Sequence, residues 1–314
     1  MKKPFPRVLV VLLVAQVLGT PALAAPAASA PAPRERLLLD TGWKFHLGND
    51  WGSGHNLAKS GSGMGPASVV FSDASWRKVD LPHDWAVELP FDKLADGSHG
   101  FKALGSAFPK NSIAWYRRTL TLPAADAGRR LWLEFDGVYR DATVFVNGWF
   151  VGRHEGGYSG FRFDITDVAE VGGRNVVAVR VDASESEGWF YEGAGIYRHT
   201  WLVKTGPVAI APDGVFTYGA FKNNLPSGPA KVHLETGLAN AAAAPAAATV
   251  IWTILDPDGK TVATARRRVR VAGFAKTDVT GLATVPVPAL WSPERPRLTK
   301  PSPPSSWAER SSIA

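Results

Sequence analysis

One stretch decides the fold: Thr143-Val144-Phe145-Val146-Asn147-Gly148-Trp149-Phe150-Val151-Gly152. Apolar residues of strand-forming type stand on both sides of an Asn-Gly pair. That pair suits a two-residue type I′ turn, because both central residues of such a turn must accept a positive φ. We therefore predict a β-hairpin at this point of the chain.

Similar short runs extend outward from the hairpin. Gly206-Pro207 ends the first series, and many short strands over residues 35–207 favour a two-sheet sandwich of the jelly-roll (galactose-binding-like) type. Residues 52–66, rich in Gly and Ser, are expected to form a long loop. The other strands expected in this unit are Leu37 to Asp40, Trp115 to Leu122, Leu131 to Phe135, Asn175 to Asp182 and Thr200 to Lys204.

A second series of strands follows over residues 208–298. Asp256-Pro257-Asp258-Gly259 reads as a turn between two of them, and the Ala-rich stretch Ala239 to Ala248 is interpreted as a loop. Strands at this spacing fit an immunoglobulin-like sandwich. The expected strands lie near Gly214 to Phe221, Ala230 to Asn240, Ala248 to Leu255, Thr261 to Val271 and Lys276 to Val285.

Composition agrees with an all-β protein. Hydrophobic residues make up 45% and charged residues 20% of the chain, which are globular values. The 31 Gly and 24 Pro divide the sequence into short pieces, and the 15 Phe and 12 Trp between them favour strands. Ordinary helices are nearly absent from the prediction.

Residues 1–24 have the pattern of a secretory signal. Lys2, Lys3 and Arg7 precede an apolar core at Val8 to Leu18, and Ala22-Leu23-Ala24 resembles a cleavage site. The core is too short to span a bilayer. Removal of this segment lowers the formal net charge from +7 to +4, because 32 Lys and Arg remain against 28 Asp and Glu. We expect a periplasmic or secreted bacterial protein whose mature chain has no stable membrane span.

Charge and residue counts also bear on partners. Residues 25–34, mostly Ala and Pro, are expected to be a flexible leader. The Arg266-Arg267-Arg268 run is interpreted as a solvated strand face, so no nucleic-acid partner is predicted. The absence of cysteine excludes disulfides and thiolate metal sites, and the seven His are dispersed. No metal and no cofactor are expected.

Six short motifs follow one another along the chain. They are Leu81-Pro82-His83-Asp84-Trp85, Ala114-Trp115-Tyr116-Arg117-Arg118, Leu133-Glu134-Phe135-Asp136-Gly137-Val138, Val146-Asn147-Gly148, Gly193-Ala194-Gly195-Ile196-Tyr197-Arg198 and Leu290-Trp291-Ser292-Pro293-Glu294. Each motif alone is weak, but six in this order over about residues 35–297 are specific. Their order resembles glycoside hydrolase family 2, and the β-galactosidase branch in particular.

The resemblance implies a jelly-roll sugar-binding domain, an immunoglobulin-like domain and then a TIM barrel that supplies two catalytic glutamates. Nothing in this sequence matches the barrel, so no catalytic residue is predicted in this chain. We expect the N-terminal part of a retaining β-galactosidase, acting on β-galactosides in carbohydrate metabolism. The alternatives are a stand-alone carbohydrate-binding protein and part of a β-glucuronidase or β-mannosidase. The oligomeric state is not predicted.

In the family, a loop of the first domain reaches the rim of the active site. The resemblance therefore makes Trp189, Tyr191, Glu192 and Asn111 the candidate substrate-binding residues. Aromatic rings can stack on sugar C–H groups, and a carboxylate can accept hydroxyl hydrogen bonds. For Gly193 to Arg198 the structural interpretation, a tight turn leading into the core, is favoured.

His83-Asp84 could suggest a catalytic pair. Adjacent residues of an extended segment point to opposite sides, so their side chains should not meet. We interpret this motif as a loop anchored by Trp85.

The sequence departs from the family pattern after Leu298. Residues 299–314 form a Pro- and Ser-rich tail, and its three prolines, Pro301, Pro303 and Pro304, cannot supply a central strand. We expect an incomplete second sandwich with an open edge, and a change of reading frame or premature stop near codon 299.

Overall fold

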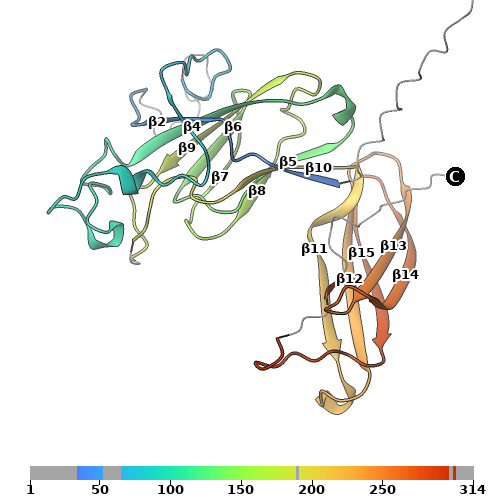
Figure 1. Cartoon of the computed structure of the whole chain (residues 1–314). Helices are drawn as coiled ribbons and strands as arrows, with labels where there is room; N and C mark the ends of the chain where they lie inside the picture. Colours follow the sequence, from blue (N-terminus) through green and yellow to red (C-terminus); the bar gives the residue numbers. More distant parts are fainter. Residues whose placement is uncertain (1–33, 52–64, 189–190, 297–299, 302–314) are drawn as a thin grey trace, which may run out of the picture. The chain divides into compact units, whose positions relative to one another are not determined.

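The computed structural model describes residues 34–51, 65–188, 191–296 and 300–301, and they form two antiparallel β-sandwiches (Figure 1). The all-β prediction is confirmed. Helical structure in the described ranges consists of four short 3-10 turns, at Trp85–Glu88 (η1), Gly97–His99 (η2), Ala124–Asp126 (η3) and Lys222–Asn224 (η4). Of the described residues, no helix is long and apolar enough to cross a membrane.

The first sandwich consists of a six-stranded sheet, in the order β3-β2-β4-β9-β6-β7, and a four-stranded sheet, in the order β1-β10-β5-β8. Its core is filled by large side chains from both sheets, with Trp43, Tyr116, Leu133 and Phe135 fully buried. The strands are β1 (Arg34–Leu38), β2 (Trp43–Leu47), β3 (Arg77–Val79), β4 (Ile113–Thr121), β5 (Arg130–Phe135), β6 (Ala142–Val146), β7 (Trp149–His154), β8 (Phe161–Asp164), β9 (Arg174–Asp182) and β10 (Thr200–Thr205).

The hairpin predicted from the sequence is formed by β6 and β7. Asn147 and Gly148 both have positive φ, 52° and 87°, as the turn requires. The side chain of Asn147 also donates to the carbonyl oxygen of Val168 at 2.8 Å, so it fixes the tip of the hairpin to a neighbouring loop.

Two details of the first sandwich differ from the prediction. The first strand begins at Arg34, before the expected Leu37, because it pairs along its whole length with β10. The short strands β3 and β8 were not predicted. They span only three and four residues, which is too short for alternation to be visible.

The second sandwich packs a sheet of order β11-β12-β15 against one of order β14-β13-β16. Trp252 lies in its core with Leu234, Leu238 and Val279. The strands are β11 (Val208–Ala220), β12 (Ala230–Asn240), β13 (Ala246–Leu255), β14 (Thr261–Val271), β15 (Ala275–Val285) and β16 (Lys300–Pro301).

The Ala-rich stretch was only partly predicted correctly. Ala239 lies within β12, which ends at Asn240, and Ala246 begins β13, so the loop is limited to residues 241–245. Ala246 pairs with Val271, and Ala239 with Lys276, so the backbone ladder overrides the low strand propensity of alanine. The two residues of β16 pair with Leu255 and Ile254, so strand pairing continues past Leu298, where the second sandwich was expected to end. Residues 302–314 lie outside the described residues.

Candidate functional site

The loop from His83 to Leu104 lies beside residues 191–196 in the first sandwich. The loop begins in one of the motifs that carry the family resemblance, and residues 191–196 overlap another. Their main chains are joined by three hydrogen bonds, from His83 N to Ile196 O at 2.9 Å, from Trp85 N to Ala194 O at 2.9 Å and from Glu192 N to Ser98 O at 2.6 Å.

Asp84 is the residue that organises this junction. One oxygen of its carboxylate accepts from the backbone N–H groups of Ala86 at 2.9 Å and Ala194 at 2.7 Å, and the other accepts from the hydroxyl of Tyr191 at 3.0 Å. A Cβ on Gly193 would lie 2.2 Å from the Asp84 carboxylate, so only glycine fits this close approach. Burial, and then the negative charge of Asp84, raise the pKa of Tyr191.

Glu192 anchors the same segment from the inside. Its side chain is 1% exposed, and its carboxylate accepts from the hydroxyl of Tyr139 at 2.6 Å and from the backbone N–H of Glu187 at 2.9 Å. Burial and the bond to Glu192 raise the pKa of Tyr139, so this hydroxyl stays protonated and donates. A buried carboxylate with these donors is a positioning group for the loop.

His99 completes the buried cluster. Its Nδ1 lies 2.7 Å from the carbonyl oxygen of Glu192, so this nitrogen carries the proton and donates. The ring is 1% exposed and packs edge-on against Tyr139 at 6.4 Å between centroids. Within the described residues, the buried Nε2 atom has no hydrogen-bond partner.

The predicted substrate-binding residues differ in where they lie. Tyr191 is 44% exposed, and its ring covers Gly100, where an added Cβ would be 2.9 Å from the ring. Glu192 faces inward, as described above. Trp189 lies outside the described residues. For all three, a contact with sugar stays a prediction.

Asn111 braces the loop. Its side-chain NH2 group donates to the carbonyl oxygen of Ala103 at 2.9 Å, and its main-chain carbonyl oxygen accepts from the indole N–H of Trp85 at 2.8 Å. Trp85 is 1% exposed, so the interpretation of the His83-Asp84-Trp85 motif as a loop anchored by Trp85 is confirmed.

His83 and Asp84 have separate partners, as expected of neighbours in an extended segment. The Nδ1 atom of His83 is 2.7 Å from the hydroxyl of Tyr116, and its Nε2 atom is 3.3 Å from the carboxylate of Glu88. Burial lowers the pKa of His83, an effect that the charge of Glu88 opposes. Arg77 binds Glu88 at 2.7 Å and balances its charge.

Sequence reasoning missed Tyr139, His99 and the anchoring role of Asp84. Each comes from a different part of the chain, and they meet through their contacts with residues 191–195. Of these three residues, only Asp84 could have been found from the sequence, since it directly precedes Trp85 in a family motif.

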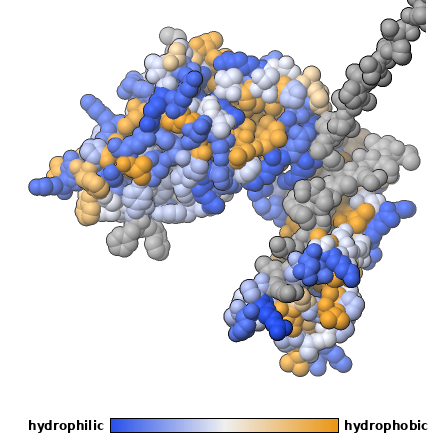
Figure 2. Space-filling model, viewed as in Figure 1, coloured by the Kyte–Doolittle hydropathy of each residue, from blue (hydrophilic) through white to orange (hydrophobic). Residues whose placement is uncertain are grey.

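Exposed apolar side chains gather on the same loop. Phe91, Leu94 and Phe101 are 74%, 83% and 59% exposed, and Lys102 lies over the ring of Phe91 at 4.2 Å. Orange residues stand among blue ones over the first sandwich in Figure 2. Aromatic rings beside hydroxyl and carboxylate groups suit the binding of an amphipathic molecule such as a sugar.

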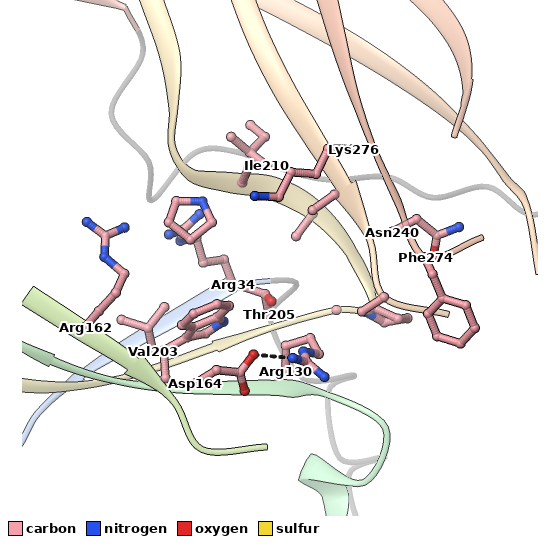
Figure 3. Close-up of a pocket in the computed structure, with 18 of the residues that line it drawn as sticks. Arg34, Arg130, Arg162, Asp164, Val203, Thr205, Ile210, Asn240, Phe274 and Lys276 are labelled. Atoms are coloured by element: carbon pink, nitrogen blue, oxygen red, sulfur yellow. Dashed lines mark hydrogen bonds and ion pairs between the residues drawn. The ribbon is translucent and has the colours of Figure 1, made fainter. Parts of the chain in front are cut away.

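A separate pocket is shown in Figure 3. It contains the cationic side chains of Arg34, Arg130, Arg162 and Lys276, and Arg130 is paired with Asp164. Of the predicted substrate-binding residues that the structure describes, Asn111, Tyr191 and Glu192, none lines this pocket. We assign it no ligand.

Comparisons with known proteins agree with the motifs. The model for the sugar binding domain of glycosyl hydrolases family 2 matches residues 103–206, and a second model, described as glycosyl hydrolases family 2, matches residues 213–300. A β-galactosidase of Bacteroides ovatus is 35% identical over 86% of this chain, which covers 29% of that protein. A β-glucuronidase of Formosa agariphila is 28% identical over 74% of this chain and 25% of its own length.

Solved structures give the same result. A crystal structure of a family 2 glycosyl hydrolase from Bacteroides cellulosilyticus has a TM-score of 0.70 and 31% identity, covering 83% of this chain and 32% of that one. The chain thus spans between a quarter and a third of the length of these relatives. The resemblance inferred from the six motifs is confirmed, and the chain belongs to glycosyl hydrolase family 2, with the sugar-binding domain and the immunoglobulin-like domain of that family.

Proposed function

We propose that this chain is the non-catalytic, sugar-facing part of a family 2 β-galactosidase. The observation that carries the proposal is the junction around Asp84, which holds the ring of Tyr191 exposed while its hydroxyl is bound at 3.0 Å. A ring held in this way can contact a sugar at little entropic cost. The β-galactosidase of Bacteroides ovatus, at 35% identity, supports galactose as the sugar.

The reaction proposed for the whole enzyme is retaining hydrolysis of a β-galactoside. It needs two carboxyl groups about 5 Å apart, one to attack the anomeric carbon and one to protonate the leaving oxygen. Asp84 and Glu192 do not suit these roles, because backbone N–H groups and tyrosine hydroxyls already occupy their oxygens. We therefore expect the catalytic pair to come from polypeptide outside this sequence.

An activity assay tests the proposal that this chain contains no catalytic carboxylates. The purified chain is expected to leave a chromogenic β-galactoside intact, and measurable hydrolysis that persists after further purification would overturn the proposal. Sequencing of the locus beyond codon 299 identifies the catalytic part. If a barrel is encoded there, the joined enzyme should hydrolyse the β-galactoside faster than the matched β-glucuronide, and the reverse preference would make it a β-glucuronidase.

A stand-alone carbohydrate-binding protein is the second candidate. It is favoured by the same exposed Tyr191, because a preorganised ring needs no barrel to stack on a sugar. Titration of the isolated chain with galactose and with lactose, followed by NMR shifts, separates the two candidates. Saturable binding that Tyr191→Ala abolishes supports the binding protein, and no binding up to about 50 mM supports a part of a larger site, since a Kd of 1 mM is already weak.

We also propose that the protein is exported. The signal pattern of residues 1–24 supports this, and the family match begins well after it, at residue 103. Mass spectrometry of the N-terminal peptide from expressing bacteria should find a mature chain that starts at Ala25. An intact Met1 on the cellular protein would contradict export.

A further inference from the structure

Strand β14 of the second sandwich carries a concentration of positive charge. Four of its eleven residues are arginine, and all four are exposed. Neither β14 nor its partner β13 contains an Asp or Glu, so no acid on these two strands neutralises the arginines. An ordinary solvated surface mixes charges of both signs. The four residues are Arg266, Arg267, Arg268 and Arg270.

Three of these arginines lie on the outer face of their sheet. On β13, every second residue from Val250 to Ile254 is buried in the core of the second sandwich, so the residues between them face outward. Residues opposite each other on neighbouring strands share a face. Arg266, Arg268 and Arg270 pair across the sheet with the exposed residues Ile251, Thr249 and Ala247. We call these three arginines the arginine row.

The arginine row is regular. Residues two apart on a strand are separated by roughly 7 Å, so the row spans roughly 14 Å from Arg266 to Arg270. Strand β13 lies between β14 and β16, so the row stands on the side of the sheet away from β16. A ligand with negative charges repeated along a chain matches this arrangement better than a single small anion does.

The chemistry of the row suits carboxylate groups. The planar guanidinium group of arginine stays charged and donates two parallel N–H bonds to the two oxygens of a carboxylate. The neighbours of the row on β13 are small or apolar, namely Ala247, Thr249 and Ile251, which is 51% exposed. They leave room for a flat ligand across the sheet, with the side chain of Ile251 against its C–H groups.

A nucleic acid matches this face less well. Proteins that bind single strands combine basic residues with aromatic side chains on which the bases stack. The one aromatic residue of β13 and β14 is Trp252, which is buried. Domains that bind nucleic acid are also strongly basic, whereas residues 208–296 carry nine Lys and Arg against six Asp and Glu. These observations favour an acidic polysaccharide.

We propose that the arginine row of β14 binds an acidic polysaccharide, whose carboxylates pair with the guanidinium groups. The choice of a polysaccharide rests on the proposed function, that of an exported part of a glycosidase, but the basic face itself does not. Binding at a second place on the same sugar chain raises the effective concentration of that chain at a separate active site. The row thus holds the enzyme on its substrate without taking part in the reaction.

Polygalacturonate tests the proposal with the full chain. The probe is a polygalacturonate oligosaccharide, labelled at its reducing end, and binding is measured by fluorescence anisotropy. Saturable binding that weakens as salt is raised is expected, because exposed charges are screened. The methyl-esterified oligosaccharide has the same sugar backbone without the charges, so it should not bind. No binding of polygalacturonate, or equal binding of its methyl ester, overturns the proposal.

Charge neutralisation locates the surface. R266Q/R268Q/R270Q should weaken the binding of polygalacturonate by roughly tenfold, as expected from the loss of three exposed ion pairs. Substitutions at exposed positions of this kind leave the fold intact, which circular dichroism checks. The matched control is K222Q/K231Q/K276Q, which removes the same number of charges at exposed residues outside the β13–β14 sheet. Equal losses in the two variants would show that only net charge matters and would overturn the assigned surface.

Two more comparisons separate this inference from the proposed function and from a nucleic-acid site. Tyr191→Ala should leave the binding of polygalacturonate unchanged, because Tyr191 lies in the first sandwich. If Tyr191→Ala abolishes that binding, the sugar-contacting junction is the site and the arginine row is not. Single-stranded DNA of equal charge should bind more weakly than polygalacturonate. Tighter binding of the DNA that R266Q/R268Q/R270Q removes would make the row a nucleic-acid site and overturn the choice of a polysaccharide.

Discussion

Asp84 gives the sharpest test of how the proposed sugar-contacting junction is held together. Asp84→Ala removes acceptors for the N–H groups of Ala86 and Ala194 and for the hydroxyl of Tyr191. Ala86 lies in the first turn of η1, for which Asp84 is the N-cap, and loss of such a cap costs about 1 kcal/mol. The N–H of Ala194, a buried residue, would be left unpaired, which costs about 1–3 kcal/mol.

The sum is a loss of about 3 kcal/mol in the free energy of unfolding of the first sandwich, allowing for incomplete additivity. For a unit of this size, that loss lowers Tm by roughly 6–12 °C. Tryptophan fluorescence reports the transition, because Trp43, Trp85 and Trp115 are fully buried in the first sandwich.

Two companion variants make the result interpretable. Asp84→Asn keeps an oxygen that can accept from both N–H groups and should lose less than half as much stability. Tyr191→Phe removes only the exposed hydroxyl bond, so it should change the free energy of unfolding by less than about 1 kcal/mol. If Asp84→Ala unfolds within about 0.5 kcal/mol of the parent, like an ordinary surface substitution, Asp84 does not hold the junction.

Three further predictions follow from the same contacts. Glu192→Gln should destabilise the first sandwich by about 2 kcal/mol. A double-mutant cycle of Glu192→Gln with Tyr139→Phe, measured by urea unfolding, should show a coupling energy of about 1 kcal/mol. Additive losses would contradict a hydrogen bond between Glu192 and Tyr139. Because the pKa of His83 is lower in the folded protein, the unfolded chain takes up the proton at a higher pH than the folded protein does. The free energy of unfolding should therefore fall as the pH drops below about 6.5 and level off below the folded pKa of His83. Urea midpoints measured between pH 8 and 5 should show this decrease, and His83→Gln should make it smaller. Trp252→Phe should lower the free energy of unfolding of the second sandwich by about 1–2 kcal/mol, because the indole N–H of Trp252 donates to the hydroxyl of Thr236 at 2.8 Å and both residues are buried. In thermal unfolding followed by circular dichroism, only the transition of the second sandwich should shift.

Sequence reasoning located those strands that have alternating apolar residues or a recognisable turn beside them. The hairpin at Asn147-Gly148 and the strand Thr261–Val271 were predicted correctly, because turn chemistry and alternation are local properties. β11 was predicted to begin only near Gly214. It begins at Val208, and the bulge between Ile210 and Val215 breaks the alternation that would have revealed the earlier half.

The junction was harder to predict, because its contacts join distant parts of the chain. Tyr139 and Glu192 are 53 residues apart, and His99 and Glu192 are 93 residues apart. No spacing rule links such positions. The sequence showed aromatic and acidic residues in one segment, but the direction in which each side chain points depends on the loops packed against it.

The two glycines of the Gly193-Ala194-Gly195 motif explain why this short segment identifies the family so well. A Cβ on Gly193 would meet the Asp84 carboxylate, and a Cβ on Gly195 would lie 2.5 Å from both the carbonyl oxygen of His83 and the hydroxyl of Tyr116. Gly195 also has a φ of 124°, a conformation that other residues rarely adopt. Residues of two other motifs, 81–85 and 114–118, therefore pack against these glycines and allow no side chain there. Each of the three motifs would be weak alone. The same fit uses the carboxylates of Asp84 and Glu192 for anchoring, so the exposed side chains of this junction, Tyr191 among them, are the groups that can meet a ligand. That division supports the proposed sugar-contacting role of this domain and gives neither carboxylate a part in breaking a bond.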